Sequence, residues 1–202
     1  MNAPIDVSNI YIQTNRLILR PWRETDLADL YEYASVPGVG EMAGWIHHKD
    51  MEESKAILNM FIEGKKTLAI VYRKNGKVIG SLGIEKLKDC DELPGEWLGR
   101  ELGYVLSQDY WGRGLMPEAV KAVIDYCFRV LNYDYLTCGH FVRNKQSRRV
   151  IEKCGFSFLM EVDHETRYGT VENTMLYYLV NRHKYMLASE HEKHFRRSKC
   201  LN

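Results

Sequence analysis

The sequence predicts a three-layer α/β domain in which helices cover both faces of a mixed β-sheet. Three observations support this prediction. Segments typical of strands and helices follow one another in the order β-α-α-β-β-β-α-β-α-β-β. The dipeptide Asn75-Gly76 joins two β-rich runs and is typical of a hairpin. Apolar residues recur at three- and four-residue steps over residues 115–131, which indicates a long helix with one broad buried face.

The first part of the chain predicts one strand and two helices. Residues 9–22 alternate apolar and polar side chains, as a half-buried strand does. Residues 24–35 follow with apolar side chains at helical spacing. A glycine-rich loop over residues 36–48 leads to a second helix over residues 49–64, for which Asp50 is the candidate N-cap.

A hairpin and a further strand come next. Residues 67–87 form the hairpin, and Asn75-Gly76 suits a tight type I′ turn at its tip. Residues 97–108 have the composition of a strand that Gly103 interrupts. A glycine inside a strand indicates a bulge or a close backbone approach, and we expect one of these at Gly103.

The last part of the chain continues the alternation of strands and helices. After the long helix, residues 133–142 predict a strand and residues 144–154 a short helix. Residues 155–180 predict two further strands around a polar turn. The expected division is an N-terminal extension over residues 1–9, one domain over residues 10–182, and a charged tail over residues 183–202.

Composition and charge exclude several classes of protein. The chain has 202 residues, enough for one well-buried domain, and no run approaches the roughly 18 apolar residues of a membrane helix. A formal net charge of +1 gives no electrostatic reason to expect DNA binding. The five cysteines form no Cys-x-x-Cys pair, so we expect free thiols and no metal site. The N-terminal segment lacks the features of a secretory signal, so we expect a cytoplasmic protein.

The stretch WGRGLMPEA, residues 111–119, places two glycines against the start of the long helix. A helix N-terminus exposes unpaired N–H groups and carries about half a positive charge, which suits an anion. Gly112 and Gly114 have no Cβ to keep a phosphate away from these groups. The alternative is an ordinary strand-to-helix turn with Pro117 in the first helical turn.

The helix expected over residues 144–154 carries two polar residues of interest. Asn144 stands where it can cap this helix by accepting from backbone N–H groups. Ser147 lies on the stripe that it shares with apolar residues such as Ile151, so its hydroxyl points along the face expected to be buried. A buried hydroxyl needs a partner, which is either the preceding helical turn or a ligand in a site.

These motifs in this order resemble the acetyl-CoA core of the GNAT superfamily of N-acetyltransferases. The resemblance rests on ELGYVL, WGRGLMPEA, the long helix, a strand, and NKQSRRVIEKCGF. The opening TNRLILRPWRETDLADLYEYA is similar to the RimJ/RimL-type branch, which acetylates protein N-terminal amines. The resemblance covers about residues 10 to 180 and implies a mostly antiparallel sheet of about seven strands, splayed at the cofactor site.

The resemblance implies acetyl-CoA as co-substrate. It places the pyrophosphate on the backbone amides of Gly112, Arg113, Gly114, Leu115 and Met116, which agrees with the anion seat described above. The other residues implied to contact the cofactor are Leu106, Trp111, Asn144 on the pantetheine arm, Ser147 near the sulfur, and Arg149. Arg148 and Arg149 either reach the nucleotide phosphates or are solvated. Trp111 and Met116 depart from the Gln or Arg and the Gly or Ala of the wider superfamily pattern.

The catalytic residues are also implied by the resemblance. Glu101 matches the glutamate that accepts the proton of the attacking amine, and a backbone N–H around Val105 matches the oxyanion donor. Many members protonate the leaving thiolate with a tyrosine, which this sequence lacks at the matching position. Ser147 is therefore the candidate acid or thiolate hydrogen-bond donor.

The acceptor side is expected between the loop over residues 36–48 and the last hairpin. Glu41 would attract a cation, Trp45 would either wall the pocket or plug the core, and Tyr168 would contribute from the hairpin. His47 and His48 are alternative bases.

The expected function is transfer of an acetyl group to a primary amine, most simply a protein or peptide N-terminus. A small-molecule amine acetyltransferase and a non-catalytic acyl-CoA sensor are the alternatives. A P-loop nucleotide-binding module is excluded, because the chain has no GxxxxGK[ST]. We expect no membrane partner, and either a monomer or a homodimer.

Overall fold

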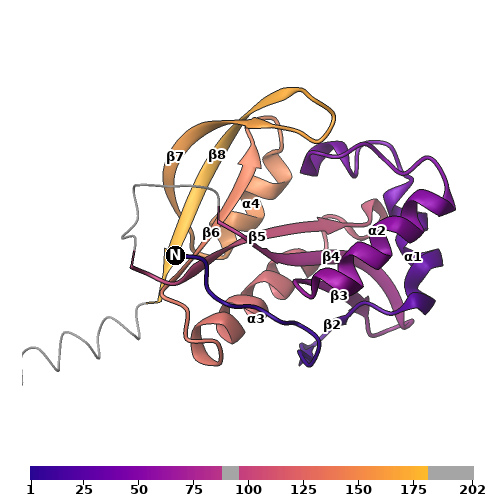
Figure 1. The fold of residues 1–202 in the computed structure, drawn as a ribbon, viewed down its shortest axis with the longest axis horizontal. Coiled ribbons are helices and arrows are strands. Elements are labelled where there is room, and N and C mark those ends of the chain that lie inside the picture. The colour runs from indigo at the N-terminus through magenta and orange to yellow at the C-terminus, as the bar shows by residue number, and fades with distance from the viewer. Residues whose placement is uncertain (88–95, 182–202) are drawn as a thin grey trace, which may run out of the picture.

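The fold is built on one sheet of eight strands, in the order β1-β2-β3-β4-β5-β6-β8-β7 (Figure 1). The computed structural model describes residues 1–87 and 96–181. The strands are β1 (Ile12–Gln13), β2 (Leu17–Pro21), β3 (Thr67–Tyr72), β4 (Lys77–Glu85), β5 (Gly99–Leu106), β6 (Tyr135–Phe141), β7 (Ser157–Glu165) and β8 (Val171–Val180). Neighbouring strands are antiparallel except for β5 and β6, which are parallel. The prediction of a mixed, mostly antiparallel sheet is confirmed, with eight strands in place of about seven.

Helices cover both faces of this sheet, which confirms the three layers. The α-helices are α1 (Leu27–Ala34), α2 (Met51–Gly64), α3 (Leu115–Arg129) and α4 (Lys145–Lys153), and the 3-10 helices are η1 (Glu24–Asp26), η2 (Glu41–Ala43) and η3 (Gln108–Tyr110). Alternation along β3 divides the core: Leu68 and Ile70 pack with α3 and α4, while Ala69 and Val71 pack with α1 and α2. A strand buried on both faces needs apolar residues at successive positions, as this strand has.

The segment before β1 packs on the domain. Ala3 and Val7 are buried in the core that α3 shares with the sheet. The Ala3 N–H donates to the Gly99 carbonyl at 3.1 Å, and the Arg100 Nε donates to the Ala3 carbonyl at 2.6 Å. Residues 1–3 thus lie against the start of β5, whereas the Val7 N–H donates to the Lys65 carbonyl at 2.9 Å, just after α2. The tail expected over residues 183–202 falls outside the described residues.

The cap of α2, the turn between β3 and β4 and the middle of β5 each carry a local prediction from the sequence. Asp50 caps α2 as predicted, since its Oδ1 accepts from the Glu53 N–H at 2.8 Å. The hairpin between β3 and β4 is confirmed, but the type I′ turn is wrong, because Tyr72 pairs with Lys77 and residues 73–76 form a four-residue loop. The bulge at Gly103 is also wrong: β4 and β5 pair without a register shift, and a Cβ at Gly103 would meet no atom within 4 Å.

The two parallel strands part in the middle of the sheet. β5 and β6 pair only from Gly99 with Tyr135 to Leu102 with Cys138, although β5 continues to Leu106. Figure 1 shows the two strands diverging beyond this point. Divergence removes the partner from one edge of β5 and opens a cleft through the sheet. The splayed sheet implied by the sequence is therefore confirmed.

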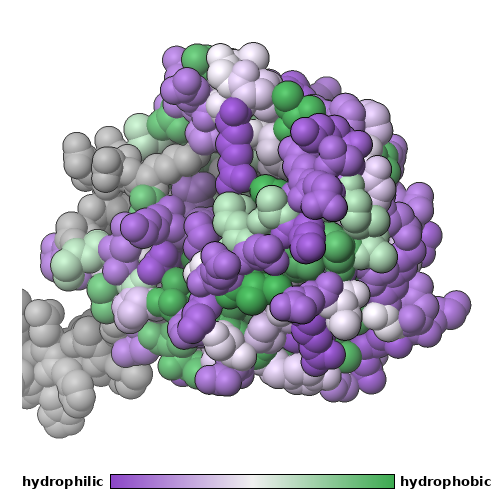
Figure 2. All heavy atoms as spheres, turned by 45° about the vertical axis from the view of Figure 1, so that its right-hand side comes forward, coloured by the Kyte–Doolittle hydropathy of each residue, from purple (hydrophilic) through white to green (hydrophobic). Residues whose placement is uncertain are grey.

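Hydrophilic residues cover most of the face drawn in Figure 2, and hydrophobic residues gather toward its middle. Within residues 1–87 and 96–181 no helix combines the length and apolar character needed to cross a bilayer. Cys127, Cys138 and Cys154 are buried free thiols, while Cys90 and Cys200 fall outside the described residues.

The close contact between β4 and β5 predicts that replacing Gly80 destabilises the fold. A Cβ at Gly80 would lie 2.3 Å from the Val105 carbonyl oxygen, a backbone atom that moves only with β5. We expect Gly80→Ala to lower the free energy of unfolding by about 1–3 kcal/mol, measured by urea denaturation. Gly103→Ala is the matched control and should change it by about 0.5 kcal/mol or less, since its Cβ enters open space. Equal effects of the two variants would contradict this account of the contact.

Candidate active site

The glycine loop before α3 presents a run of free backbone donors. Gly112 and Gly114 adopt φ values of +74° and +70°, which disfavour residues with a Cβ. Among the described residues, no acceptor receives a hydrogen bond from the amides of residues 112–116. No Cβ contact restricts the space at Gly112. Consecutive unpaired N–H groups at a helix N-terminus form a seat for a phosphate-like anion.

A cavity of about 460 Å³ extends from this loop into the cleft between β5 and β6. Most of the predicted site residues line it: Glu101, Val105, Leu106, Trp111, Gly112, Gly114, Leu115, Met116, Asn144, Ser147 and Arg149. Arg113 does not line the cavity, and its guanidinium lies 5.1 Å from the centre of the Tyr110 ring. Its backbone amide remains part of the loop. The structure thus gathers residues from β5, α3 and α4 around one cavity.

Arg148 and Arg149 separate at this cavity. Arg148 pairs with Glu152 at 2.8 Å on the exposed side of α4, as a solvated helix residue does. Arg149 lines the cavity, and Lys153, one turn later on the same side, lines it as well. Sequence reasoning missed Lys153, although its spacing of four residues from Arg149 is the signal that could have found it. Two cations therefore border the cavity from α4.

Glu101 and Ser147 approach the cleft from opposite faces of the sheet. Glu101 shares a face of β5 with Val105, which packs against the α1 and α2 core. Directly opposite Glu101 in β4 stands Glu85, whose carboxylate forms an ion pair with Lys66. Ser147 lies in the first turn of α4, on the other side. The divergence of β5 and β6 is what lets both side chains border the same cavity.

Tyr104 provides the partner that the Ser147 hydroxyl needs. Its OH lies 2.9 Å from the Ser147 Oγ, and it also lines the cavity. Desolvation of the hydroxyl raises the pKa of Tyr104 well above its ordinary value, so this group stays protonated at neutral pH. Sequence reasoning found no tyrosine in α4 and missed this one in β5. The alternation in ELGYVL, which turns Tyr104 to the face opposite Glu101, was the available signal.

Asn144 is a helix cap and a tie to another loop. Its Oδ1 accepts from the Ser147 N–H at 3.0 Å, so the capping interpretation is confirmed. Its Nδ2 donates to the Met42 carbonyl at 3.0 Å. Both ends of the side chain are thus engaged, and Asn144 fixes the start of α4 relative to η2.

The η2 segment closes one end of the cavity. Met42 and Ala43 line the cavity there, whereas Glu41 and Trp45 do not. Trp45 packs against Gly40 and lies 5.1 Å from the His48 ring, within the core of α1 and α2. This placement corresponds to the core plug among the two alternatives for Trp45.

Arg143 ties this segment to the last hairpin. Its Nη2 donates to the Glu41 carbonyl at 2.8 Å and pairs with the Glu172 carboxylate at 2.8 Å. Tyr168 interacts with Arg143 and raises its pKa further, after the larger effect of Glu172. Tyr168 does not line the cavity, but His164 of β7 does. Sequence reasoning missed both Arg143 and His164, because only the fold brings η2 beside β7 and β8.

The two candidate histidines of the loop interact with side chains outside the cavity. His47 Nδ1 lies 2.7 Å from the Glu41 carboxylate. His48 is buried, its Nδ1 lies 2.7 Å from the Ser54 Oγ, and burial lowers its pKa. Neither histidine lines the cavity.

The comparison with protein families identifies the fold. The family model described as an acetyltransferase (GNAT) domain matches residues 16–157, more than half of the chain. The chain belongs to the GNAT acetyltransferase family. It is an N-acetyltransferase by this membership, and the resemblance stated from the sequence is confirmed.

Known relatives agree with this membership. An uncharacterized N-acetyltransferase, p20 of Bacillus licheniformis, is 27% identical over 150 residues, which cover 72% of this chain and 81% of the relative. A GNAT-family acetyltransferase structure from Bacillus anthracis matches with a TM-score of 0.75 at 20% identity, covering 86% of this chain and 99% of that one. The ribosomal-protein-S5-alanine acetyltransferase of Vibrio fischeri matches with a TM-score of 0.65 at 19% identity, covering 86% and 97%.

A further similar structure contains the donor substrate. The microcin C7 self-immunity acetyltransferase MccE was solved with acetyl-CoA and AMP, and it matches with a TM-score of 0.68 at 17% identity over 83% of this chain and 93% of that one. The residues of this GNAT protein suit acetyl-CoA. The unpaired amides of residues 112–116 suit its pyrophosphate, and Arg149 and Lys153 add positive charge at the cavity. Among the described residues, no group of three His, Cys, Asp or Glu side chains could hold a metal ion.

The Glu41 carboxylate predicts a pH-dependent stability. Burial alone would raise the pKa of Glu41, but hydrogen bonds from His47 and the Gly38 amide outweigh it and lower the pKa from 4.5 to about 2. The charged form therefore stabilises the fold above about pH 4.5 and loses this contribution as the pH falls toward about 2. We expect Glu41→Gln to lower the melting temperature at neutral pH, with the difference from wild type shrinking below about pH 4.5.

Circular dichroism melts between about pH 7 and about pH 3 measure this difference. Glu63→Gln, at an exposed position of α2, is the control and should follow the wild type throughout. A Glu41→Gln difference that stays constant over this range would show that the carboxylate charge is not the cause.

Proposed function

We propose that this GNAT protein transfers the acetyl group of acetyl-CoA to the α-amine of a protein or peptide N-terminus, with both substrates bound together. The observation that carries the proposal is the cleft between β5 and β6, where one cavity borders the glycine loop, Glu101 and Ser147. Acetyl-CoA supplies a thioester whose C–S bond breaks as the amine forms the new C–N bond. Proximity in one cavity replaces a covalent enzyme intermediate.

Glu101 is the proposed general base. An amine attacks only as the free base, and α-amines have pKa values of about 7.7–8.0, so a large part is protonated at neutral pH. A carboxylate within the cleft accepts that proton, directly or through water, and such a base contributes roughly 10²–10⁴-fold to the rate. The Val105 amide, on the same diverging segment of β5, is the proposed donor to the developing oxyanion.

Ser147 is the proposed acid toward the departing thiolate. Its Oγ gives its proton, or a hydrogen bond, to the sulfur, and the Tyr104 OH at 2.9 Å supports it from behind. Because Tyr104 stays protonated, it can donate to the Ser147 oxygen as negative charge develops there. Two hydroxyl groups in series thus take the place of a single tyrosine.

The charge of the cavity favours a monoamine acceptor. Among the described residues that line it, Glu101 is the one acidic side chain, while Arg149, Lys153, His140 and His164 are basic or titratable. A polyamine or an aminoglycoside carries several positive charges and would need further carboxylates. A peptide N-terminus carries one charge at the reacting amine, which a single carboxylate can match. The similarity to an enzyme named for a ribosomal-protein alanine is a second, weaker support.

Calorimetry followed by an acceptor screen tests this proposal. We expect the full chain to bind acetyl-CoA with a dissociation constant in the micromolar range, about −8 kcal/mol, and not to bind ATP. Peptides with a free N-terminal Ala or Ser should gain one acetyl group by mass spectrometry, whereas the same peptides with a blocked N-terminus and an internal Lys should not. Glu101→Gln separates binding from catalysis. It should leave the affinity for acetyl-CoA unchanged and lower the turnover by about 10²-fold or more. Acetylation of spermidine in preference to the peptides would establish a small-molecule acceptor, and binding without turnover on any amine would establish a sensor.

The pairing of Ser147 with Tyr104 gives a separate prediction. Ser147→Ala should lower kcat by about 10²-fold, and Tyr104→Phe, which keeps the ring and removes only the hydroxyl, by about tenfold. The double variant should be no slower than Ser147→Ala, because the tyrosine acts through the serine. Release of free thiol measures these rates, and Tyr126→Phe on α3 is the control. Fully multiplicative effects of the two substitutions would separate their roles.

A further inference from the structure

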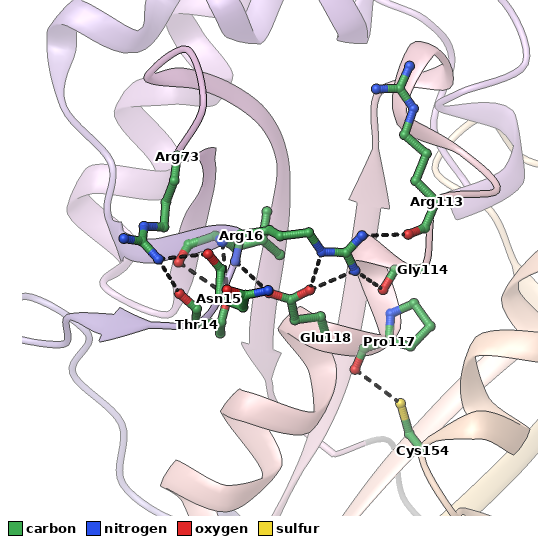
Figure 3. A network of polar contacts seen from close by, with 10 residues as sticks. Thr14, Asn15, Arg16, Arg73, Arg113, Gly114, Pro117, Glu118 and Cys154 are labelled. Atoms are coloured by element: carbon green, nitrogen blue, oxygen red, sulfur yellow. Dashed lines mark hydrogen bonds and ion pairs between the residues drawn. The ribbon is translucent and has the colours of Figure 1, made fainter.

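The turn between β1 and β2 is joined to the start of α3 by a compact polar network (Figure 3). Glu118, in the first turn of α3, accepts at one oxygen from the Thr14 Oγ1 at 2.6 Å and from the Arg16 N–H at 2.9 Å. Its other oxygen accepts from the Arg16 Nε at 2.7 Å. Arg73 holds the turn from the far side, donating to the carbonyls of Thr14 at 2.9 Å and Asn15 at 2.7 Å. The Arg16 side chain is thereby fixed in one orientation.

The remaining donors of Arg16 reach the glycine loop through its carbonyl groups. Nη1 donates to the Arg113 carbonyl at 2.8 Å, and Nη2 approaches the Gly114 carbonyl at 3.3 Å. Figure 3 shows the Arg113 side chain extending away from Arg16 while its carbonyl oxygen turns toward it. Arg16 therefore contacts the backbone of the loop and not its side chains.

Because peptide units are planar, the contacts of Arg16 with two carbonyl groups also set the direction of the N–H groups in the same units. In a trans peptide the C=O and the N–H of one unit point in opposite directions. When Arg16 holds the carbonyls of Arg113 and Gly114 on the outer side, the N–H groups of Gly114 and Leu115 point the other way. Gly114 and Leu115 line the cavity, and their amides have no acceptor among the described residues. The network thus orients two backbone N–H donors of the expected anion-binding site.

The side chains of Trp111 and Arg113 also anchor this loop, on the Leu106 carbonyl and the Tyr110 ring, but its two glycines have no side chain to hold them. Gly112 and Gly114 both have positive φ values, and glycine has the largest conformational freedom to lose on ordering. Gly114 provides no side-chain cap for α3. A loop ordered before the ligand arrives binds more tightly, because the ordering cost is already met within the fold.

Arg16 is not placed to be a phosphate ligand itself. It does not line the cavity, and Glu118 neutralises its charge through an ion pair of 2.7 Å. Its planar fork can hold one carboxylate oxygen and two carbonyl oxygens at once, which a lysine ammonium cannot do with the same geometry.

We propose that Arg16, fixed by Glu118, is a positioning residue that orients the amides of Gly114 and Leu115 toward the pyrophosphate of acetyl-CoA. This proposal rests on the proposed use of acetyl-CoA at the glycine loop. It assigns a role in donor binding to the N-terminal turn, although Arg16 precedes the two residues whose carbonyls it contacts by 97 and 98 positions in the chain.

The test compares a donor that has the pyrophosphate with one that lacks it. We expect Arg16→Gln to weaken acetyl-CoA binding about tenfold by calorimetry and to raise its KM by the same factor with kcat little changed. With S-acetylpantetheine, which has no pyrophosphate, kcat/KM should equal that of the wild type. Equal losses with both donors, or no loss with either, would overturn the proposal, because a general distortion of the cleft does not distinguish them.

Further variants keep the test decisive. Arg16→Lys keeps the charge and should weaken acetyl-CoA binding severalfold even if Arg16→Gln folds poorly. Arg16→Gln combined with Glu118→Gln should be no weaker than Arg16→Gln alone, since the carboxylate acts through the arginine. Arg129→Gln is the matched control, because it breaks the exposed 2.6 Å pair with Asp125 on the same helix and should leave binding unchanged. Wild-type protein that fails to bind acetyl-CoA would refute the proposed function itself, whereas tight binding by both wild type and Arg16→Gln refutes only the positioning role.

Discussion

The end of pairing between β5 and β6 is the constraint on which the rest of this structure depends. The two strands share only the register from Gly99–Tyr135 to Leu102–Cys138. Parallel neighbours normally continue side by side and bury both faces. Here β6 stays paired with β8 along its whole length while it diverges from β5, and the freed length of β5 borders a cavity that passes through the sheet. Residues on opposite faces of β5 would otherwise be separated by the sheet itself.

This geometry divides the proposed chemistry between two faces. Glu101 belongs to the side of α1 and α2, while Tyr104 and Ser147 belong to the side of α3 and α4. Proton removal from the amine and proton delivery to the thiolate are therefore kept apart by the width of one strand. A base and an acid placed in direct contact would neutralise each other, so this separation suits a direct transfer.

An arginine that donates hydrogen bonds to backbone carbonyls stabilises a loop at each end of the cavity. At the proposed cofactor end Arg16 donates to the carbonyls of Arg113 and Gly114, and at the proposed acceptor end Arg143 donates to the Glu41 carbonyl. Each arginine is itself fixed by a carboxylate, Glu118 or Glu172. Glycine-rich segments that need positive φ are flexible by composition, and a guanidinium with several donors can order them without a regular hydrogen-bond ladder.

The sequence by itself determined the order of strands and helices, the caps at Asp50 and Asn144, and the glycine loop at the start of α3. These features depend on periodicity, capping and backbone freedom, which are properties of neighbouring residues. It did not reveal the regular pairing at Gly103 or the wider turn before Lys77, because register is decided between strands. Tyr104 beside Ser147 and Arg16 beside Gly114 were decided only by the tertiary structure. Those partners lie far apart along the chain, and nothing in local sequence records which distant side chain will fill the remaining hydrogen-bond positions.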